Sequence, residues 1–303
     1  MKVSDFPYYH PPFPAYNKAQ VAVIPYLDKD VNVVVSFPTA AGKTVVAECA
    51  FAYLLKTDPN CSVAYVCPSR ALADERVKDW YGNSQLSQYG IAQETSDSDN
   101  RMTNDYSKRL IVATIEAFDA KTRSAAWQSW IKRLKCVTFD ESHLLGDKSR
   151  GGALEAAIMR FTALNSDSKL ILLSATMSNT LELAKWIKSL NGKATKAIVS
   201  NWRPTKIITQ HHLVADSRER DAKAVELALR DKDSKTIVFV HSKRVGLDIA
   251  KRIKSTGIRV AFHCASVPRI RRVKMEKAFD SRASGLNILV STSTLAAGIN
   301  LAK

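Results

Sequence analysis

Residues 31–44, V-N-V-V-V-S-F-P-T-A-A-G-K-T, constrain the fold of this chain more than any other stretch. The β-branched apolar run predicts a buried parallel strand. Small residues then form a turn, and the pattern over residues 45–55 predicts a helix. Backbone N–H groups in such a turn, with a helix N-terminus behind them, form a concave anion site. We therefore predict a phosphate site, in which Lys43 reaches the β- and γ-phosphates of a nucleoside triphosphate and Thr44 contacts magnesium.

One position departs from the general phosphate-loop pattern, because Phe37 stands where that pattern has a glycine. The alternative interpretation is an ordinary strand, turn and helix with a chance Gly-Lys-Thr. A predicted strand before the turn and a predicted helix after it are the context that phosphate binding requires. The phosphate site is therefore the leading interpretation.

The composition is that of a globular protein. The 303 residues are 46% hydrophobic and 24% charged, which suffices for two domains of ordinary size. No apolar run reaches the ~18 residues that span a bilayer, and the N-terminus lacks the apolar core of a signal peptide. The five cysteines form no C-x-x-C pair, which argues for buried, reduced thiols and against zinc. We expect a cytoplasmic protein, or a nuclear one in a eukaryote, that is neither secreted nor membrane-bound.

The net charge of +16 is distributed unevenly along the chain. Residues 1–200 hold 24 basic and 20 acidic residues, whereas residues 201–303 hold 21 basic and 9 acidic residues. A local surplus of this size indicates a polyanionic partner, most simply the backbone of a nucleic acid. The alternative is a basic surface that only faces solvent.

Predicted strands and helices alternate in two series, which indicates an α/β fold of parallel sheets covered by helices. We expect a first domain over residues 1–200, a joint at residues 201–205, and a second domain over residues 206–303. The strands predicted for the second domain are residues 207–214, 236–240, 260–264 and 287–290. No strand or helix closes this series before Lys303, so we expect a second domain that is truncated in a longer natural protein.

A second chemical feature is V-T-F-D-E-S-H at residues 137–143, where an apolar strand ends in two adjacent carboxylates. The carboxyl ends of parallel strands lie at one edge of a sheet, beside the predicted phosphate loop. We expect Asp140 to hold magnesium and Glu141 to orient and deprotonate the water that attacks the γ-phosphate. A surface acidic pair at a helix start is the alternative, and the Gly-Lys-Thr upstream argues against it.

Together these motifs resemble the DExH-box helicases of superfamily 2, in their Ski-like branch. In that branch P-T-A-A-G-K-T is the form of the phosphate loop, which removes the objection raised by Phe37. The joint N-W-R-P is most similar to that of the archaeal and eukaryotic DNA-repair members. Further matching stretches follow in family order: C-P-S-R-A-L-A-D-E, A-T-I-E, S-A-T-M-S-N, V-F-V-H-S-K and T-S-T-L-A-A-G-I-N-L.

The resemblance implies roles for individual residues. The nucleotide would be bound by an adenine-reading glutamine, the phosphate loop and a later glycine, namely Gln20, Pro38, Thr39, Ala40, Ala41, Gly42, Lys43, Thr44 and Gly298. For Gln20, a glutamine that only faces the core is the alternative. The nucleic-acid backbone would be held by Ser69, Arg70, Ala113, Thr114, His241, Ser242, Lys243, Thr292 and Thr294. Coupling between the ATP state and strand binding would involve His143, Ser174, Thr176 and Asn300.

What the resemblance implies as a whole is a motor of two RecA-like domains that hydrolyses ATP with Mg²⁺. We expect a monomeric helicase that moves 3′ to 5′ along a single or forked strand, with DNA favoured over RNA and a role in repair or replication-fork processing. Two alternatives stay open: an RNA helicase of the same branch, and an ATP-gated clamp or remodeller that never separates strands.

One departure from the family pattern bears on activity. The last helicase motif, with its Q-x-x-G-R-x-G-R arginines, does not occur before Lys303. In the family these arginines act on the γ-phosphate, and such a finger is worth roughly 10³–10⁵ in rate. We therefore expect the chain as given to bind nucleotide but to hydrolyse ATP weakly or not at all.

Overall fold

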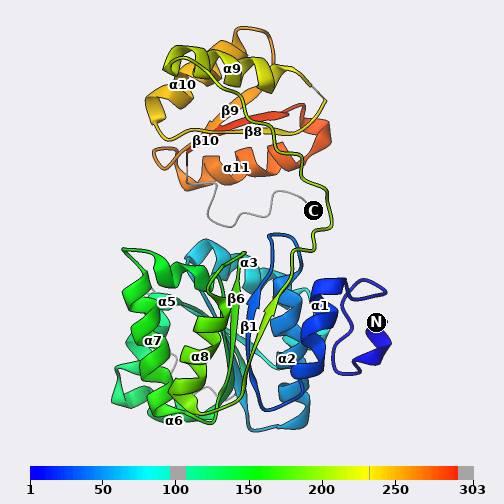
Figure 1. The fold of residues 1–303 in the computed structure, drawn as a ribbon, viewed down its shortest axis with the longest axis vertical. Coiled ribbons are helices and arrows are strands. Elements are labelled where there is room, and N and C mark those ends of the chain that lie inside the picture. The colour runs from blue at the N-terminus through cyan, green and yellow to red at the C-terminus, as the bar shows by residue number, and fades with distance from the viewer. Residues whose placement is uncertain (96–106, 232, 293–303) are drawn as a thin grey trace. The chain divides into compact units, whose positions relative to one another are not determined.

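The computed structural model describes residues 1–95, 107–231 and 233–292. The chain divides into two compact units, Met1–Ile207 and Ile208–Lys303. Each unit is an α/β domain with its own sheet and its own hydrophobic core (Figure 1).

Unit 1 is built on a seven-stranded sheet in the order β3-β4-β2-β5-β6-β1-β7. Every pairing between these strands is parallel. The central strands β1, β2, β5 and β6 are almost wholly buried because helices cover both faces. The bounds are β1 Asn32–Ser36, β2 Ser62–Cys67, β3 Ile91–Glu94, β4 Leu110–Thr114, β5 Leu134–Phe139, β6 Lys169–Ser174 and β7 Thr195–Val199.

Alternating side chains of the unit 1 strands build two separate cores. Val33 and Val35 of β1 belong to one core and Val34 to the other, because successive strand residues face opposite sides of a sheet. The first core is closed by α1 Lys18–Val23, α2 Lys43–Thr57, α3 Arg70–Tyr81 and α4 Ser84–Ser87. The second is closed by α5 Ile115–Thr122, α6 Gln128–Arg133, α7 Gly151–Leu164 and α8 Thr180–Asn191, as Figure 1 shows for most of these helices.

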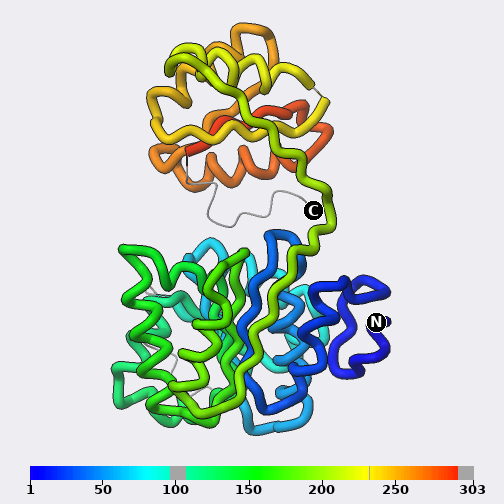
Figure 2. Tube along the Cα trace, in the orientation of Figure 1, coloured from blue at the N-terminus to red at the C-terminus, as the bar shows by residue number. Residues whose placement is uncertain are grey.

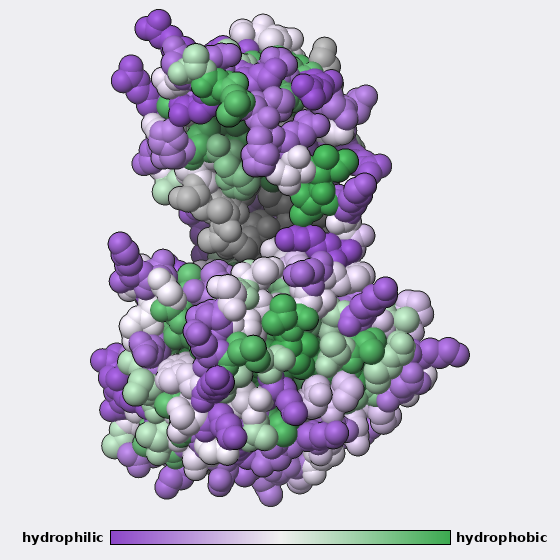
Figure 3. Space-filling view, in the orientation of Figure 1, coloured by the Kyte–Doolittle hydropathy of each residue, from purple (hydrophilic) through white to green (hydrophobic). Residues whose placement is uncertain are grey.

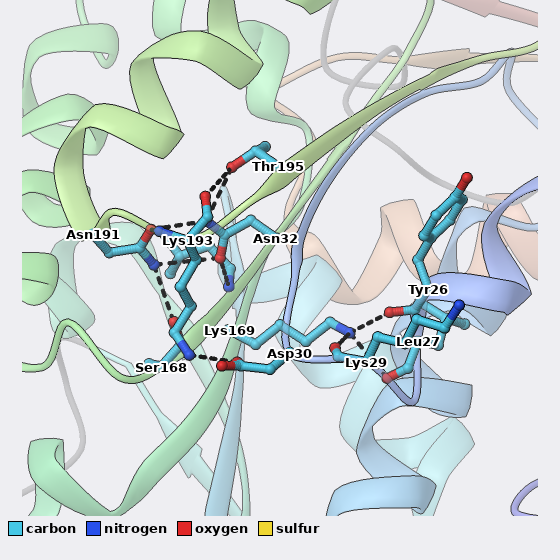
Figure 4. A network of polar contacts seen from close by, with 11 residues as sticks. Tyr26, Leu27, Lys29, Asp30, Asn32, Ser168, Lys169, Asn191, Lys193 and Thr195 are labelled. Carbon is cyan, nitrogen blue, oxygen red and sulfur yellow. Dashed lines mark hydrogen bonds and ion pairs between the residues drawn. The ribbon is translucent and has the colours of Figure 1, made fainter.

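A buried lysine at the N-terminal edge of the sheet holds the end of the first helical segment. Lys169, the first residue of β6, donates from Nζ to the carbonyl oxygens of Tyr26 at 2.6 Å, Leu27 at 2.9 Å and Lys29 at 2.8 Å (Figure 4). These carbonyls lie at the end of the 3-10 turn Ile24–Tyr26 and just after it; those of Tyr26 and Lys29 also accept from the Lys29 and Val31 N–H groups, at 3.4 and 2.9 Å. Lys169 thereby caps the helical segment that carries Gln20, the predicted adenine-reading residue.

Unit 2 contains a smaller parallel sheet in the order β8-β10-β9. Its strands are β8 Thr236–Phe239, β9 Val260–His263 and β10 Ile288–Ser291. Helices α9 Ser217–Leu229 and α10 Lys243–Lys254 pack on one face, and α11 Arg269–Asp280 packs on the other. The chain trace in Figure 2 shows the same layered arrangement.

The predicted strand at residues 207–214 is wrong, because the structure has irregular backbone there. Its apolar side chains face solvent: Ile208 is 75% exposed and Leu213 is 100% exposed. A β-branched run becomes a strand only where a neighbouring strand and a packed face accept it, and within the described residues no strand pairs with this segment.

The other predicted helices and strands agree with the structure to within a few residues, but four were missed. These are the edge strands β3 and β7 and the helices α4 and α5. Both strands are short, and the pattern of β7 is only partly apolar because it lies at the edge of the sheet. No helix among the described residues is long and apolar enough to cross a bilayer. Hydrophilic side chains are spread over the visible face of both units (Figure 3).

Candidate nucleotide and nucleic-acid site

The phosphate loop, residues 38–44, connects β1 to α2 as the sequence predicts. Gly42 has φ +76° and Ala40 has φ +65°, so the loop uses two left-handed residues to turn into the helix. No side chain caps the N-terminus of α2. Its first backbone N–H groups are therefore directed to the space where an anion can bind.

Two side chains from the start of α1 form hydrogen bonds to the backbone of the phosphate loop. Asn17 donates from Nδ2 to the Ala41 carbonyl at 3.0 Å, and Gln20 donates from Nε2 to the Gly42 carbonyl at 3.3 Å. Asn17 and Gln20 also form a reciprocal capping box at the N-terminus of α1. The φ of +76° favours glycine at position 42, and a Cβ atom there would also lie 2.4 Å from Gln20 Nε2 and displace that amide. Gln20 is thus placed against the nucleotide loop, with both amide atoms bonded within the protein.

Asp140 follows β5 and lies at the same sheet edge as the phosphate loop, because β5, β6 and β1 are neighbouring parallel strands. Its backbone N–H donates to the Val66 carbonyl at 2.8 Å, which continues the sheet pairing by one residue. Its carboxylate accepts from the Tyr65 hydroxyl at 2.6 Å and from the Glu141 N–H at 2.9 Å. The orientation of this carboxylate is therefore fixed at both oxygens.

Glu141 adopts a left-handed conformation with φ +51°, which is uncommon for a residue other than glycine. Burial raises the pKa of Glu141, the Asp140 charge raises it further, and Lys43 and His143 act in the opposite direction. Within the loop, Lys43 Nζ donates to the Phe37 carbonyl at 3.4 Å. The Oε2 atom of Glu141 is buried without a hydrogen-bond partner, 3.2 Å from His143 Nδ1 in an ion-pair contact. It is the acceptor that a reacting water would need.

The oxygen donors at this edge fit magnesium. Thr44 supplies a hydroxyl and Asp140 a carboxylate, which are ligand types that Mg²⁺ prefers. Among the described residues, no group of three or more His, Cys, Asp or Glu side chains forms a metal site. This agrees with the usual way in which Mg²⁺ is bound, by one or two protein oxygens together with substrate phosphates.

The turn after β6 is tied to both halves of the nucleotide site. His143 Nδ1 lies 3.5 Å from Ser174 Oγ, at the limit of a hydrogen bond. The Ser174 carbonyl accepts from the Phe37 N–H at 3.1 Å, and the Ser36 hydroxyl donates to the Ala175 carbonyl at 3.3 Å. Thr176 is exposed at the tip of this turn. The predicted coupling residue His143 therefore lies next to Ser174, and Ser174 pairs with the strand that leads into the phosphate loop.

The predicted nucleic-acid residues of unit 1 lie at helix starts after β2 and β4. Ser69 caps α3 by accepting from the Leu72 N–H at 3.3 Å, and Arg70 is exposed next to it. Ala113 is buried, and Thr114 is 2% exposed and caps α5. The side chains of Ala113 and Thr114 are thus occupied in the fold, which leaves the exposed Arg70 as the charged group of this set.

In unit 2 the predicted residues lie at the carboxyl ends of β8 and β10. His241 and Lys243 are exposed and Ser242 is half-buried, and Lys243 donates to the Ser266 hydroxyl. The Thr292 N–H donates to the His263 carbonyl at 3.1 Å. The remaining predicted site residues lie outside the described residues: Thr294, Gly298 and Asn300.

The structure adds three residues to the site for which no role was predicted from the sequence. Asn17 braces the phosphate loop, Ser36 bonds the turn after Ser174, and Tyr65 binds Asp140. Asn17 lies three residues before the predicted Gln20, in Y-N-K-A-Q, so its place near the nucleotide could have been predicted from the sequence. Ser36 and Tyr65 are buried strand residues, and nothing in the sequence distinguishes them from other sheet residues.

Comparison with known proteins decides the family. Residues 17–184, which carry Gln20, the phosphate loop and the D-E-S-H box, match the DEAD/DEAH box helicase family. The chain belongs to this helicase family. Residues 219–303 match the helicase conserved C-terminal domain, so both units of the helicase chain are accounted for. The resemblance to superfamily 2 helicases is confirmed.

Two archaeal relatives show how much of a helicase this chain spans. It is 31% identical over 310 residues to the ATP-dependent DNA helicase Hel308 of Pyrococcus abyssi, covering 89% of this chain and 41% of the relative. It is 28% identical over 323 residues to the protein of the same name from Thermoplasma volcanium, covering 95% of this chain and 46% of the relative. The chain thus spans less than half the length of these curated relatives.

Solved helicase structures have the same fold. The helicase MrfA bound to DNA and AMPPNP superposes with a TM-score of 0.77 at 19% identity, covering 96% of this chain and 43% of that chain. Dbp5 of S. cerevisiae, bound to RNA and ADP BeF3, gives a TM-score of 0.69 at 20% identity, covering 95% of this chain and 72% of that chain. The predicted RecA-like α/β architecture is confirmed.

Proposed function

We propose that the protein is an ATP-dependent DNA helicase whose two RecA-like domains step 3′ to 5′ along one strand. The observation that carries this proposal is the assembly of three motifs at one edge of the unit 1 sheet. The phosphate loop, the Asp140–Glu141 pair and the Ser174 turn follow the neighbouring strands β1, β5 and β6. Membership of the helicase family supports the same conclusion.

Each group in the nucleotide site has a task in the proposed hydrolysis. Lys43 holds the β- and γ-phosphates against the open N-terminus of α2. Glu141 orients a water and takes its proton through the unpartnered Oε2 atom. Thr44 and Asp140 would hold magnesium, which supplies neutralisation of the charge that develops on the transferred phosphoryl group.

We also propose that Gln20 reads the adenine base. Its amide already donates to the Gly42 carbonyl in the phosphate loop. Base recognition and the position of the loop therefore depend on one side chain. Gly298, which lies outside the described residues, completes the proposed nucleotide contacts.

The proposed strand-binding residues lie at the carboxyl ends of the strands in both units. Phosphate contacts of this kind position a strand without reading its sequence. The surplus of 21 basic over 9 acidic residues in residues 201–303 supports binding of a polyanion. We favour DNA over RNA because the relatives at about 30% identity are named DNA helicases, and we expect a monomer. The residues are Ser69, Arg70, Ala113, Thr114, His241, Ser242, Lys243, Thr292 and Thr294, with His143, Ser174, Thr176 and Asn300 coupling them to the nucleotide.

The test is an ATPase assay of the full-length gene product with and without single-stranded DNA or RNA, followed by unwinding of duplexes with 3′ or 5′ overhangs. We expect DNA to stimulate hydrolysis, and 3′-tailed duplexes to be unwound. Lys43→Ala should abolish nucleotide binding, and Glu141→Gln should bind nucleotide but lower turnover by at least about 100-fold.

A matched control comes from the other end of the same helix. Lys56→Ala removes an exposed lysine near the C-terminus of α2 and should leave the ATPase unchanged. An ATPase rate that is the same with and without polynucleotide would overturn the motor proposal.

A further inference from the structure

A buried tyrosine lies directly behind the proposed magnesium carboxylate. Tyr65 is 1% exposed in the middle of β2, and its hydroxyl donates to Asp140 Oδ2 at 2.6 Å. β2 and β5 are parallel neighbours in which Tyr65 is paired with Thr138. Because side chains alternate along a strand, Asp140 lies on the same face as Thr138, two residues further on. The sheet register therefore brings the phenol within reach of the carboxylate.

The direction of this hydrogen bond is fixed by chemistry. An ionised carboxylate has no proton to give, so the phenol is the donor and Asp140 the acceptor. Asp140 Oδ1 accepts in turn from the Glu141 N–H at 2.9 Å. With one donor on each oxygen, the plane of the carboxylate is held, and each oxygen keeps a lone pair for another ligand.

The tyrosine ring is itself held in place by packing. Trp80 of α3 meets it edge-on, with ring centroids 5.2 Å apart and an interplanar angle of 85°. The indole Nε1 of Trp80 donates to Glu48 Oε1 at 2.7 Å, and Glu48 lies on α2, the helix that begins at Lys43. The phenol hydroxyl is thus pre-oriented by the same two helices that flank β2.

We propose that Tyr65 is a positioning residue that aims the Asp140 carboxylate at the magnesium of the bound nucleotide. This inference rests on the proposed function of the site. Mg²⁺ requires near-ideal octahedral geometry, so a small rotation of a ligand carboxylate weakens binding. Groups that orient metal ligands typically contribute about 10–100-fold to metal affinity or activity.

The experiment compares Tyr65→Phe with wild type in the full-length protein. Affinity for a fluorescent, non-hydrolysable ATP analogue is measured in EDTA and in saturating Mg²⁺. We expect wild type and variant to have equal affinities in EDTA, because the phosphate loop is untouched. The factor by which Mg²⁺ increases the affinity, here called the Mg²⁺ gain, should be about 10-fold smaller in the variant. The Mg²⁺ concentration for half-maximal strand-stimulated ATPase should rise by a similar factor.

Tyr9→Phe is the matched control. Tyr9 is also buried at 1% exposure, and its hydroxyl also donates to a carboxylate, Glu48 Oε2 at 2.9 Å. A purely structural effect of losing a buried phenol hydroxyl, worth about 1 kcal/mol, should appear in both variants as a lower Tm. Only Tyr65→Phe should alter the Mg²⁺ gain.

A second variant tests whether Tyr65 acts through Asp140. In an Asp140→Asn background, adding Tyr65→Phe should cause no further loss of the Mg²⁺ gain. If Tyr65→Phe keeps the wild-type Mg²⁺ gain while wild type shows strand-stimulated ATPase, the positioning role is wrong and the helicase function stands. If wild type itself gains no nucleotide affinity from Mg²⁺, the proposed nucleotide site fails instead.

Discussion

Glu141 stands in an environment that disfavours its negative charge. Burial raises its pKa first, then the charge of Asp140, while Lys43 and His143 oppose the shift. A general base must be ionised to accept a proton from water. If Glu141 is the base, hydrolysis should be lost on acidification near the pKa of Glu141, which these neighbours set.

We expect the pH profile of strand-stimulated kcat to have an acid limb above 4.5, the ordinary value for a glutamate. His143→Asn removes a group 3.2 Å from Glu141 that lowers this pKa. The acid limb should then move to higher pH, and the rate at high pH should change less than the rate at low pH. His10→Asn, at an exposed histidine of the N-terminal segment, is the control. A limb at the same or lower pH in His143→Asn would contradict the role of Glu141 as the base.

At this scale the sequence pointed to the residues that we propose to react, but not to those that orient them. Lys43, Asp140 and Glu141 stand in motifs whose chemistry can be stated from residue type and spacing. Tyr65 binds a residue 75 positions away, and Ser36 accepts the Met177 N–H across 141 positions. Only the register of the sheet brings such pairs together, and register is a property of the folded chain.

Among the elements, the segment from α1 to the turn Ile24–Tyr26 ends on a single buried side chain. Lys169 supplies three donors to three carbonyls at its end (Figure 4). Burial lowers the pKa of Lys169 to about 8. The three acceptors match the three protons of the ammonium form and oppose that shift.

Lys169→Met should therefore lower the free energy of unfolding by about 1–3 kcal/mol, because it removes three hydrogen bonds, among them the one to the buried Leu27 carbonyl. Lys193→Met is the control in the same network. Lys193 pairs with the exposed Asp30, and a surface ion pair contributes less than about 1 kcal/mol. Denaturant unfolding of both variants gives the comparison. Equal losses of stability in the two variants would show that the hydrogen bonds from Lys169 stabilise the fold no more than a surface ion pair does.

A glycine fixes the approach of α10 to the unit 2 sheet. A Cβ atom at Gly246 would clash with the Phe262 ring and lie 2.9 Å from Val240 Cγ2. Gly246→Ala should cost about 1–3 kcal/mol of unit 2 stability by overpacking, although alanine is ordinarily the better helix former. Gly152→Ala in α7 meets nothing within 4 Å and should be neutral or stabilising. Thermal unfolding measures both, and a Gly246→Ala variant as stable as wild type would refute the close approach.

The sequence predicted elements best where they are buried on both faces. The mostly apolar run Ser62–Cys67 forms strand β2, and every residue in it is buried. The segment at residues 207–214, I-I-T-Q-H-H-L-V, also carries β-branched and apolar residues, yet it is irregular and exposed. The difference lies in the neighbours: β2 is flanked by β4 and β5, and a run of apolar residues does not reveal whether such neighbours exist.

At the scale of the whole molecule, two α/β units with different charge balance follow from the sequence pattern. The surplus of basic residues in residues 201–303 can be read from the composition, and it supports the proposed binding of a nucleic-acid strand. The proposed phosphate and magnesium contacts lie in unit 1, where strand order brings the motifs to one edge of the sheet.

We propose above all that Lys43 and the Asp140–Glu141 pair act on the same bound triphosphate. A crystal structure with a non-hydrolysable ATP analogue and Mn²⁺ in place of Mg²⁺ tests it most directly, because manganese is located by its anomalous signal. We predict one manganese peak bonded to Thr44 Oγ1, an Asp140 oxygen or a water on it, and the β- and γ-phosphates, at about 2.0–2.2 Å. Glu141 should face a water in line with the γ-phosphate. Phosphates bound away from Lys43, or a metal that contacts neither Thr44 nor Asp140, would contradict the account.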